Sequence, residues 1–431
     1  MEALFILAIL FALLLMRVPI YICLYLTGVL GLWIFTDLDF SFVAQTMLKK
    51  LDNFSLLSIP FFILLGAVMV RGQSATRLVN LAWKCVSWLP GGLGITAVMS
   101  SGVFGAISGS SISTVVTIGG VMFPHMEKYH YPKAFSVGLV TSAAILGIII
   151  PPSIIMIICA LTAGESVVRL FAAGYLPGVL IMAMLSLYAW WEARRKGLGG
   201  EQALEPFDPA GLLKAAGQAF FPLLIIAILF GGIYSGAFTI TEASVVSCAL
   251  VLAVEMLVYR AVSLKDLRDL FISSGMVSGA LVITVSGAGV ISEYIVLREI
   301  PQKILEVSMA YIPNQWSYLI FTCLVLLIIG TFMDQIGAIM ILAPIMMPIA
   351  GQLGVDPIHY CLLFTVGLGI GYITPPLGLL LYTAQAITRL DFVQVSRAIA
   401  PPLVIYIAAL FILAMVPWFS TVLPNFLLGP Q

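Results

Sequence analysis

The chain consists of long apolar segments separated by short polar connections. A window of about 20 apolar residues is long enough to cross a bilayer as a helix. We predict ten membrane spans, over residues 3–16, 18–36, 54–70, 133–160, 172–191, 218–236, 239–259, 272–296, 357–387 and 400–420. The first two form a pair, or one long helix kinked at Arg17-Val18-Pro19. Residues 40–52 have the pattern of a short amphipathic helix at the membrane interface.

Two further apolar stretches, 94–122 and 317–349, are each interrupted near the middle by small and polar residues. Neither half of either stretch is long enough to cross a bilayer, so we interpret both as re-entrant helical hairpins. Non-helical backbone at that depth is tolerated only where it is buried in protein or lines a cavity. The hairpins therefore mark where a site within the membrane is expected.

Helix-breaking residues recur along the chain at a constant separation of 224 residues. The first set comprises Pro124, Gly147, Pro151, Pro152 and Pro177, and the second comprises Pro348, Gly371, Pro375, Pro376 and Pro401. This register predicts two structural repeats, each with a hairpin followed by a broken helix. A membrane protein that breaks its helices at equivalent places in two halves usually exposes backbone groups to a polar ligand near the bilayer midplane. The pattern indicates a transporter.

Composition supports the same class. Hydrophobic residues make up 61% of the chain and charged residues 9%, against roughly 25% charged in soluble domains, so an all-α polytopic membrane protein in contact with lipids is expected. The net charge is zero, which excludes a basic surface for nucleic acid. The six cysteines form no CxxC pair, so neither a disulfide framework nor a zinc site is indicated. The start, Met1-Glu2-Ala3, lacks the positive charge of a cleavable signal, so we expect the first apolar segment to be retained.

Basic residues predict the orientation. With both termini outside, 15 Lys and Arg residues fall inside and 5 outside, as the positive-inside rule requires. Segments 54–70 and 272–296 then run in opposite directions, so the repeats are inverted, which is the usual architecture of alternating access. We divide the chain into N-terminal scaffold and interfacial helices (1–53), a first inverted repeat with hairpin 94–122 and broken helix 133–160 (54–191), a cytoplasmic linker with scaffold helices (192–271), a second inverted repeat with hairpin 317–349 and broken helix 357–387 (272–420), and an external tail (421–431).

The first hairpin turns at Ser108-Gly109-Ser110-Ser111. Glycine permits a tight non-helical turn, hydroxyls and freed carbonyls offer oxygen ligands, and the following half-helix presents N–H groups to an anion. Alternatively, small residues and hydroxyls simply let helices pack closely in lipid. Gly109 lies 42 residues before Pro151, and the second repeat has the same layout, which favours a binding tip.

The second hairpin turns around Gly330-Thr331-Phe332-Met333-Asp334-Gln335, and Asp334 is the only acidic residue within the apolar stretch of either hairpin. An ionised carboxylate in the membrane is costly unless it is paired. No basic residue is near in the sequence, so a bound cation is one partner. A helix N-cap is the other interpretation, because Asp334 immediately precedes an apolar run. One carboxylate can serve both roles.

The proline pairs complete the candidate site. The breaks at Ile150–Ser153 and Thr374–Gly378 lack backbone donors at their prolines, which leaves carbonyls unpaired. Each break is expected to face its own hairpin tip and to give an oxygen cage suited to Na⁺, with a half-helix start suited to a carboxylate. A simple kink would explain a single proline, but not two pairs in register.

Other candidates for chemistry are weak. His125, His130 and His359 fall in predicted loops without a set of metal ligands, so we expect them at the membrane interface. The sequence contains no paired acids, Ser–His pair or phosphate loop that would indicate hydrolysis or group transfer. We therefore expect no enzyme, no catalytic residue, no cofactor and no metal other than Na⁺.

Six long motifs stand out along the chain: IPFFILLGAVM (59–69), PGGLGITAVMSSGVFGAISGSS (90–111), ILGIIIPPSIIMI (145–157), GAFTITEAS (236–244), GTFMDQIGAIMILAPIMMPI (330–349) and GIGYITPPLGLLLY (369–382). They resemble those of a known family, the large membrane subunit of tripartite ATP-independent periplasmic (TRAP) transporters. The resemblance covers nearly the whole chain. Two positions depart from it: Ile240 stands where the family usually has a proline, and Ser113 where alanine is common.

The resemblance implies the fold of the ion-transporter superfamily, in which a transport domain moves against a scaffold as an elevator. It implies Na⁺ coupling, a bacterial inner-membrane location with both termini periplasmic, a small four-helix membrane subunit and a soluble periplasmic binding protein. The implied first Na⁺ site comprises Ser108, Gly109, Ser110, Ser111, Pro151 and Ser153, and the second comprises Gly330, Thr331, Asp334, Thr374 and Pro375. The implied substrate carboxylate lies between them, against Ser111, Pro152, Ser153, Thr374, Pro376 and Gly378.

The implied function is import of small organic anions such as C4-dicarboxylates, sialic acid or sulfonates. The alternative is a stand-alone Na⁺/carboxylate symporter of the same superfamily, which would need no partners. Co-purification with a small four-helix protein would discriminate between the two.

Overall fold

The computed structural model describes residues 8–10, 12–13, 16, 18–36, 40–198, 206–303 and 314–430. All regular secondary structure in these ranges is helical, which confirms the predicted all-α class. Much of the predicted span 3–16 lies outside the described residues.

Several of the described helices begin at a residue whose side chain caps the helix. Four described helices start with a capping box, in which the cap residue and the third helical residue exchange side chain-to-backbone hydrogen bonds. The described helices of the first half are α2 (Ile20–Phe35), α3 (Phe40–Leu51), the 3-10 helix η1 (Phe54–Leu57), α4 (Ser58–Arg71), α5 (Ser74–Val86), α6 (Gly92–Ser108), α7 (Ser111–Lys128), α8 (Lys133–Ala143), α9 (Leu146–Ile149), α10 (Ile154–Ala163) and α11 (Val167–Lys196).

The second half has the same character. Its described helices are α12 (Pro209–Gln218), α13 (Phe220–Tyr234), α14 (Ile240–Ala253), the π-helix η3 (Val254–Val258), α15 (Leu264–Leu297), α17 (Gln315–Gly330), α18 (Gln335–Gln352), α19 (Pro357–Gly371), α20 (Leu379–Thr388), α21 (Phe392–Met415) and α22 (Trp418–Leu428). The predicted interfacial helix at 40–52 corresponds to α3.

Length and apolar composition identify the helices that can cross a membrane. Six spans in the described ranges qualify: η1 with α4, α11, α14 with η3, α15, α18 and α21. The prediction that neither half of the hairpin 317–349 is long enough to cross is therefore wrong for its second half, α18. Two bent pairs also qualify, α8–α9 with α10, bent by 44°, and α12 with α13, bent by 62°. The protein is thus a multi-pass membrane protein, and the total of ten spans stays a prediction.

The C-terminal end folds back onto the molecule. α21 ends at Met415, and α22 follows Pro417 and packs against α11 and α19. The prediction that the histidines fall in loops is wrong for His125, which lies in the last turn of α7, and for His359. His359 sits in the first turn of α19 with only 1% of its surface exposed. Its Nδ1 lies 2.7 Å from Oγ of Ser420 in α22, which covers it. His125 and His130 are exposed.

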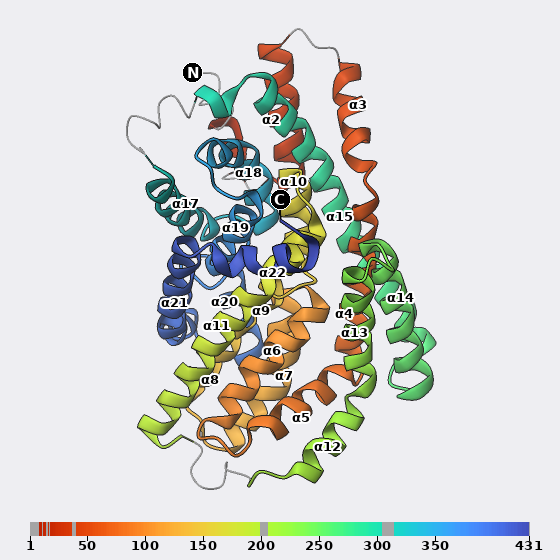
Figure 1. Ribbon diagram of the computed structural model, residues 1–431, viewed down its shortest axis with the longest axis vertical. Coiled ribbons are helices and arrows are strands. Elements are labelled where there is room, and N and C mark those ends of the chain that lie inside the picture. The colour runs from red at the N-terminus through yellow and green to blue at the C-terminus, as the bar shows by residue number, and fades with distance from the viewer. Residues whose placement is uncertain are drawn as a thin grey trace.

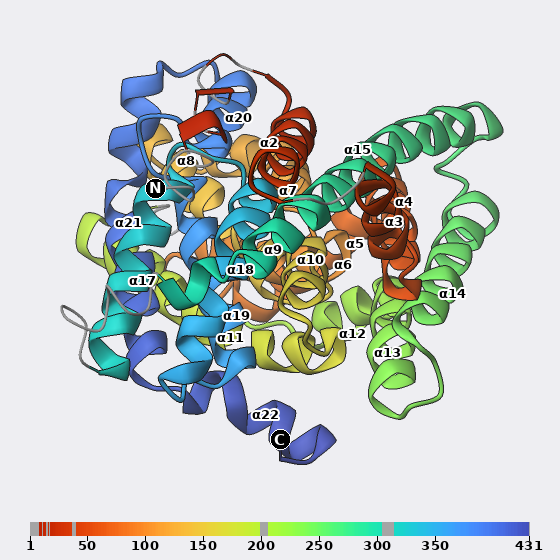
Figure 2. The same cartoon turned by 90° about the horizontal axis from the view of Figure 1, so that it is seen from above.

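The helices separate into two groups. Figure 2 shows α3, α4, α13 and α14 on one side of the molecule, and the two hairpins with the broken helices on the other. α15 packs along α2, α3 and α4 and also contacts α18, so it lies between the groups. In Figure 1 the hairpin α6–α7 lies in the lower part of the molecule and the hairpin α17–α18 in the upper part. The two hairpins therefore approach the centre from opposite ends.

The repeats interlock through their broken helices. The second helix of the first hairpin, α7, packs against α20, which follows the break of the second repeat. In the same way α18, from the second hairpin, packs against α10, which follows the break of the first repeat. This exchange brings both hairpin tips and both breaks to the middle of one compact body.

Candidate ion and substrate site

The first hairpin breaks where the sequence predicts. α6 ends at Ser108, and Gly109 adopts a left-handed conformation with φ of 59°, which glycine adopts without a side-chain clash. Ser110 is extended and caps α7, where its Oγ accepts from Ser113 N at 3.4 Å. Its carbonyl oxygen accepts from Thr114 Oγ1 at 2.7 Å. The tip is therefore built from hydroxyl and carbonyl oxygens.

This tip lies directly against the first proline break. A Cβ added to Gly109 would lie 2.9 Å from the carbonyl oxygen of Pro152 and 3.5 Å from Ile154 N. Ser153 is extended and caps α10, with its Oγ accepting from Met156 N at 3.4 Å. The structure thus brings the predicted residues 108–111 and 151–153 together, and any larger residue at 109 would separate them.

The second hairpin has the same design with a charged residue added. α17 ends at Gly330, and Thr331 Oγ1 donates to the carbonyl of Ile328 at 2.7 Å. Asp334 caps α18, and its Oδ2 accepts from Ile336 N at 3.1 Å. Ser110 and Asp334, which cap the second helix of each hairpin, are separated by the repeat distance. The N-cap interpretation of Asp334 is confirmed, and its role as a cation ligand stays a prediction.

Tyr372 completes this tip and was not found from the sequence. Its hydroxyl donates to Asp334 Oδ1 at 2.7 Å and lies 3.4 Å from the backbone nitrogen of Gln335. Asp334 is partly exposed, whereas Tyr372 is buried with 6% of its surface exposed. Tyr372 donates to Oδ1 of Asp334 and Ile336 N donates to Oδ2, and each carboxylate oxygen can accept more than one hydrogen bond. The carboxylate of Asp334 can therefore still bind a cation.

Glycine pairs hold each tip against its break. A Cβ added to Gly371 would overlap the carbonyl group of Gly330, so the ends of α19 and α17 are in backbone contact. In the first repeat a Cβ added to Gly105 would overlap the Cα of Gly147. Gly147 and Gly371 are the repeated glycines of the sequence. Glycine recurs at these two positions because another helix backbone lies too close for a side chain.

The two half-sites adjoin near Gln335. A Cβ added to Gly369 would lie 2.9 Å from Ile148 Cδ1 and 3.3 Å from Gln335 Nε2. Gln335 is fully buried, and its Nε2 donates to the carbonyl of Thr365 at 3.2 Å. Within the described part of the chain its Oε1 has no hydrogen-bond partner. The sequence signal for Gln335 was its position one repeat distance after Ser111.

The two breaks differ in exposure. Pro151, Pro152 and Ser153 are buried, whereas Pro375 and Pro376 are exposed and Thr374 is partly exposed. Both Pro-Pro bonds are cis. Gly378, with φ of 37°, ends the second break and begins α20. Of the predicted substrate residues, Thr374 and Pro376 in the second repeat are therefore accessible. Gly378 and the substrate residues of the first repeat are buried.

The amino-acid sequence from residue 7 to 419 matches the family model described as tripartite ATP-independent periplasmic transporter, DctM component. The chain belongs to this family. It is 38% identical over 402 residues to the C4-dicarboxylate TRAP transporter large permease protein DctM of Pseudomonas aeruginosa, with 93% of each chain covered. The protein of the same name from Rhodobacter capsulatus is 34% identical over 441 residues, which covers 99% of this chain and 100% of the relative.

A solved structure supports the fold of this DctM family member. The structure of the Alcanivorax borkumensis YdaH transporter, described as having an unusual topology, is similar with a TM-score of 0.61 and 13% sequence identity. The similarity covers 89% of this chain and 90% of that one. The family resemblance read from the motifs is confirmed, and the relatives are permeases rather than enzymes.

Proposed function

We propose that this chain is the large transport subunit of a sodium-coupled importer of small organic anions. It acts with a small four-helix membrane subunit and a soluble periplasmic binding protein, as the family's tripartite name suggests. The chain lies in the bacterial inner membrane with both termini periplasmic. The observation that carries the proposal is the repeated contact between a hairpin tip and a proline break, with Asp334 at the second tip.

The first Na⁺ site lies at the first tip and break. Hydroxyl and carbonyl oxygens are the ligands preferred by hard cations, and the contact between Gly109 and the carbonyl of Pro152 supports such a cage. The ligands proposed for it are Ser108, Gly109, Ser110, Ser111, Pro151 and Ser153.

The second Na⁺ site lies at the second tip and break. Asp334 supplies a negative charge that a cation neutralises, and Tyr372 orients it. The proposed ligands are Gly330, Thr331, Asp334, Thr374 and Pro375. No cofactor is required, because a cation gradient can supply the free energy of uptake.

The substrate carboxylate binds between these sites. Four helices, α7, α10, α18 and α20, begin at a tip or a break, and helix N-termini attract anions. The proposed contacts are Ser111, Pro152, Ser153, Thr374, Pro376 and Gly378. Two relatives are named for C4-dicarboxylates, so a short dicarboxylate such as succinate is the first substrate to test.

Alternating access occurs as an elevator. The body formed by both hairpins and both broken helices moves against a scaffold that includes α3, α4, α13, α14 and α15. The separation of these groups in Figure 2 and the interlocked packing of α7 with α20 and α18 with α10 support a rigid moving body. A rigid body keeps the ions and the anion in register while they cross.

The test is reconstitution of the chain with its small subunit in proteoliposomes. A candidate periplasmic binding protein, loaded with labelled succinate or sialic acid, is added outside with an inward Na⁺ gradient. Uptake that needs the binding protein supports the three-part system. Uptake without the binding protein would support the stand-alone symporter instead.

A further inference from the structure

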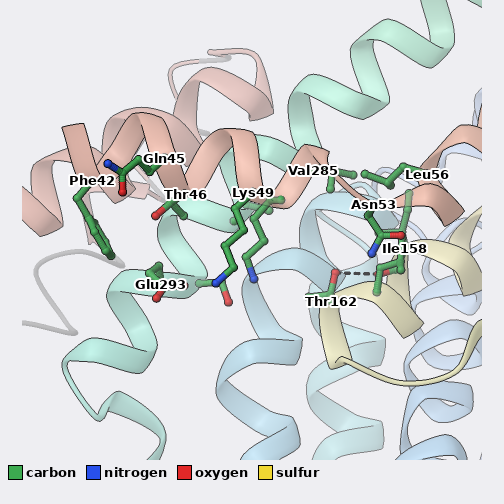
Figure 3. A pocket seen from close by; sticks show the side chains of 15 residues that line it. Phe42, Gln45, Thr46, Lys49, Asn53, Leu56, Ile158, Thr162, Val285 and Glu293 are labelled. Atoms are coloured by element: carbon green, nitrogen blue, oxygen red, sulfur yellow. Dashed lines mark hydrogen bonds between the residues drawn. The ribbon is translucent and has the colours of Figure 1, made fainter. Parts of the chain in front are cut away.

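A cavity of about 400 Å³ lies between α3, α10 and α15, apart from the two tips. Figure 3 shows the side chains that line it. Among these described residues, none belongs to a hairpin tip or a proline break. The volume falls in the range of about 300–1,000 Å³ that is typical of small-molecule sites. The cavity is large enough for a ligand of its own.

One wall of the cavity is charged and polar. Lys49 and Lys50 lie in the last turn of α3, and both are exposed. In Figure 3 Lys49 from α3 and Glu293 from α15 extend into the same space. A Cβ added to Gly289 would overlap Lys50 Cγ, so the aliphatic stem of Lys50 lies on α15 and its ammonium group extends beyond it. Gln45 and Asn53 add amide groups that can donate or accept hydrogen bonds.

The rest of the cavity lining is largely apolar. Phe42, Leu56, Ile158 and Val285 contribute apolar surface from all three helices and the adjoining η1. Since α3 is amphipathic, a cavity at its edge lies where the headgroups of a bilayer meet its acyl chains. Such a lining suits a molecule with an anionic group at one end and apolar groups at the other.

We propose that this cavity binds the phosphate or carboxylate group of an amphipathic ligand through Lys49 and Lys50. Glu293 accepts from an ammonium or hydroxyl group of the same ligand. The anionic group is that of a phospholipid headgroup, and binding of a soluble organic acid is the other outcome of the test. Because α10 belongs to the moving body of the proposed function and α3 and α15 to its scaffold, a ligand here contacts both.

The experiment measures binding, not uptake, so its failure and that of the proposed function are distinguishable. The purified full-length chain in detergent is titrated with dihexanoyl phosphatidylethanolamine, with succinate, and with dihexanoylglycerol, which lacks the phosphate. Each Kd is compared with that of the double variant Lys49→Gln, Lys50→Gln. Lys214→Gln, which changes an exposed lysine of α12, is the matched control.

Hydrogen bonds to charged groups predict that the double variant binds about tenfold or more weakly, while Lys214→Gln binds as the natural chain does. Loss confined to the phospholipid supports the proposal, and loss confined to succinate overturns it in favour of a soluble-anion site. Equal binding by the natural chain and the double variant overturns the proposal. Dihexanoylglycerol binding as tightly as the phospholipid also overturns it, because the site would then be merely apolar.

The role of Glu293 has a separate test. Glu293→Gln should weaken binding of dihexanoyl phosphatidylethanolamine but not of dihexanoyl phosphatidic acid, which has no ammonium group. An equal effect on both lipids would remove Glu293 from the ligand contacts.

Discussion

The hydroxyl of Tyr372 donates a hydrogen bond of 2.7 Å to Asp334, and this bond ties the second hairpin tip to the helix that ends at the second break. In the first repeat the corresponding connection is made by backbone, where Gly109 approaches the carbonyl of Pro152. The two half-sites therefore have one geometry but different chemistry. A negative charge is present only at the second tip, among the described residues of the two tips.

Removing the charge of Asp334 while keeping its cap tests its role most simply. Asparagine is as good an N-cap as aspartate, so Asp334→Asn should abolish or strongly weaken the Na⁺ dependence of uptake and change the unfolding temperature little. Asp391→Asn is the matched control, because Asp391 caps α21 in the same way, away from either tip. Na⁺ dependence that survives in Asp334→Asn would remove this residue from the ligands.

Tyr372→Phe should weaken Na⁺ binding by about tenfold or more, because hydrogen bonds to charged groups contribute about 1.5–3 kcal/mol. The aromatic ring and its packing are kept, so protein yield should not change. Tyr188→Phe, on α11, serves as the control. An unchanged Na⁺ affinity in Tyr372→Phe would mean that Asp334 is positioned by its cap alone.

Gly371→Ala should disrupt the second half-site. The added methyl group would overlap the carbonyl of Gly330, and overpacking of this kind costs about 1–3 kcal/mol. Gly351→Ala in α18 is the control, because a Cβ there meets nothing within 4 Å. Alanine is favoured over glycine inside a helix by about 1 kcal/mol, so this control should be neutral or stabilising. Unfolding temperatures of both purified variants check the prediction, and a Gly371→Ala protein as stable and active as Gly351→Ala would contradict it.

Glu255 should be important for stability although it is far from either tip in the sequence. It is fully buried in η3 and accepts from Gln73 N and Ser74 N, each at 2.9 Å, and from Ser74 Oγ at 2.5 Å. These hydrogen bonds connect the start of α5 to η3 in the scaffold. Glu255→Ala would leave these donors without an acceptor, at a cost of about 1–3 kcal/mol for each buried group.

The comparison for Glu255→Ala is Glu127→Gln, which removes an exposed ion pair with Lys133. Exposed pairs contribute about 0–1 kcal/mol, so this variant should unfold close to the temperature of the natural chain. Thermal unfolding in detergent measures both, and equal effects would show that the buried contacts of Glu255 do not support the junction.

The breaks of the fold could be predicted from the sequence because glycine and proline act locally. The tips at Gly109 and Gly330 and the ends of α9 and α19 follow from residues at those positions. Ile240, where the family usually has proline, leaves the turn intact because Thr239 and Glu242 form a capping box. Local chemistry was sufficient at each of these places.

Contacts between distant segments were not predictable in the same way. Tyr372 meets Asp334 and His359 meets Ser420 only after helices far apart in sequence pack together. The burial of Gln335 between the repeats depends on the same packing. An apolar helix carries no sequence pattern that distinguishes the face toward lipid from the face toward another helix, so these partners could be found only in three dimensions.

Binding of radioactive sodium to the purified chain tests the central claim most directly. The natural chain should bind Na⁺ saturably at two sites, and K⁺ should not compete at equal concentration. Asp334→Asn should lose the second of the two sites, while Asp391→Asn retains both. Saturable Na⁺ binding that is identical in all three proteins, or no binding to the natural chain, would contradict a sodium site built on the second hairpin tip.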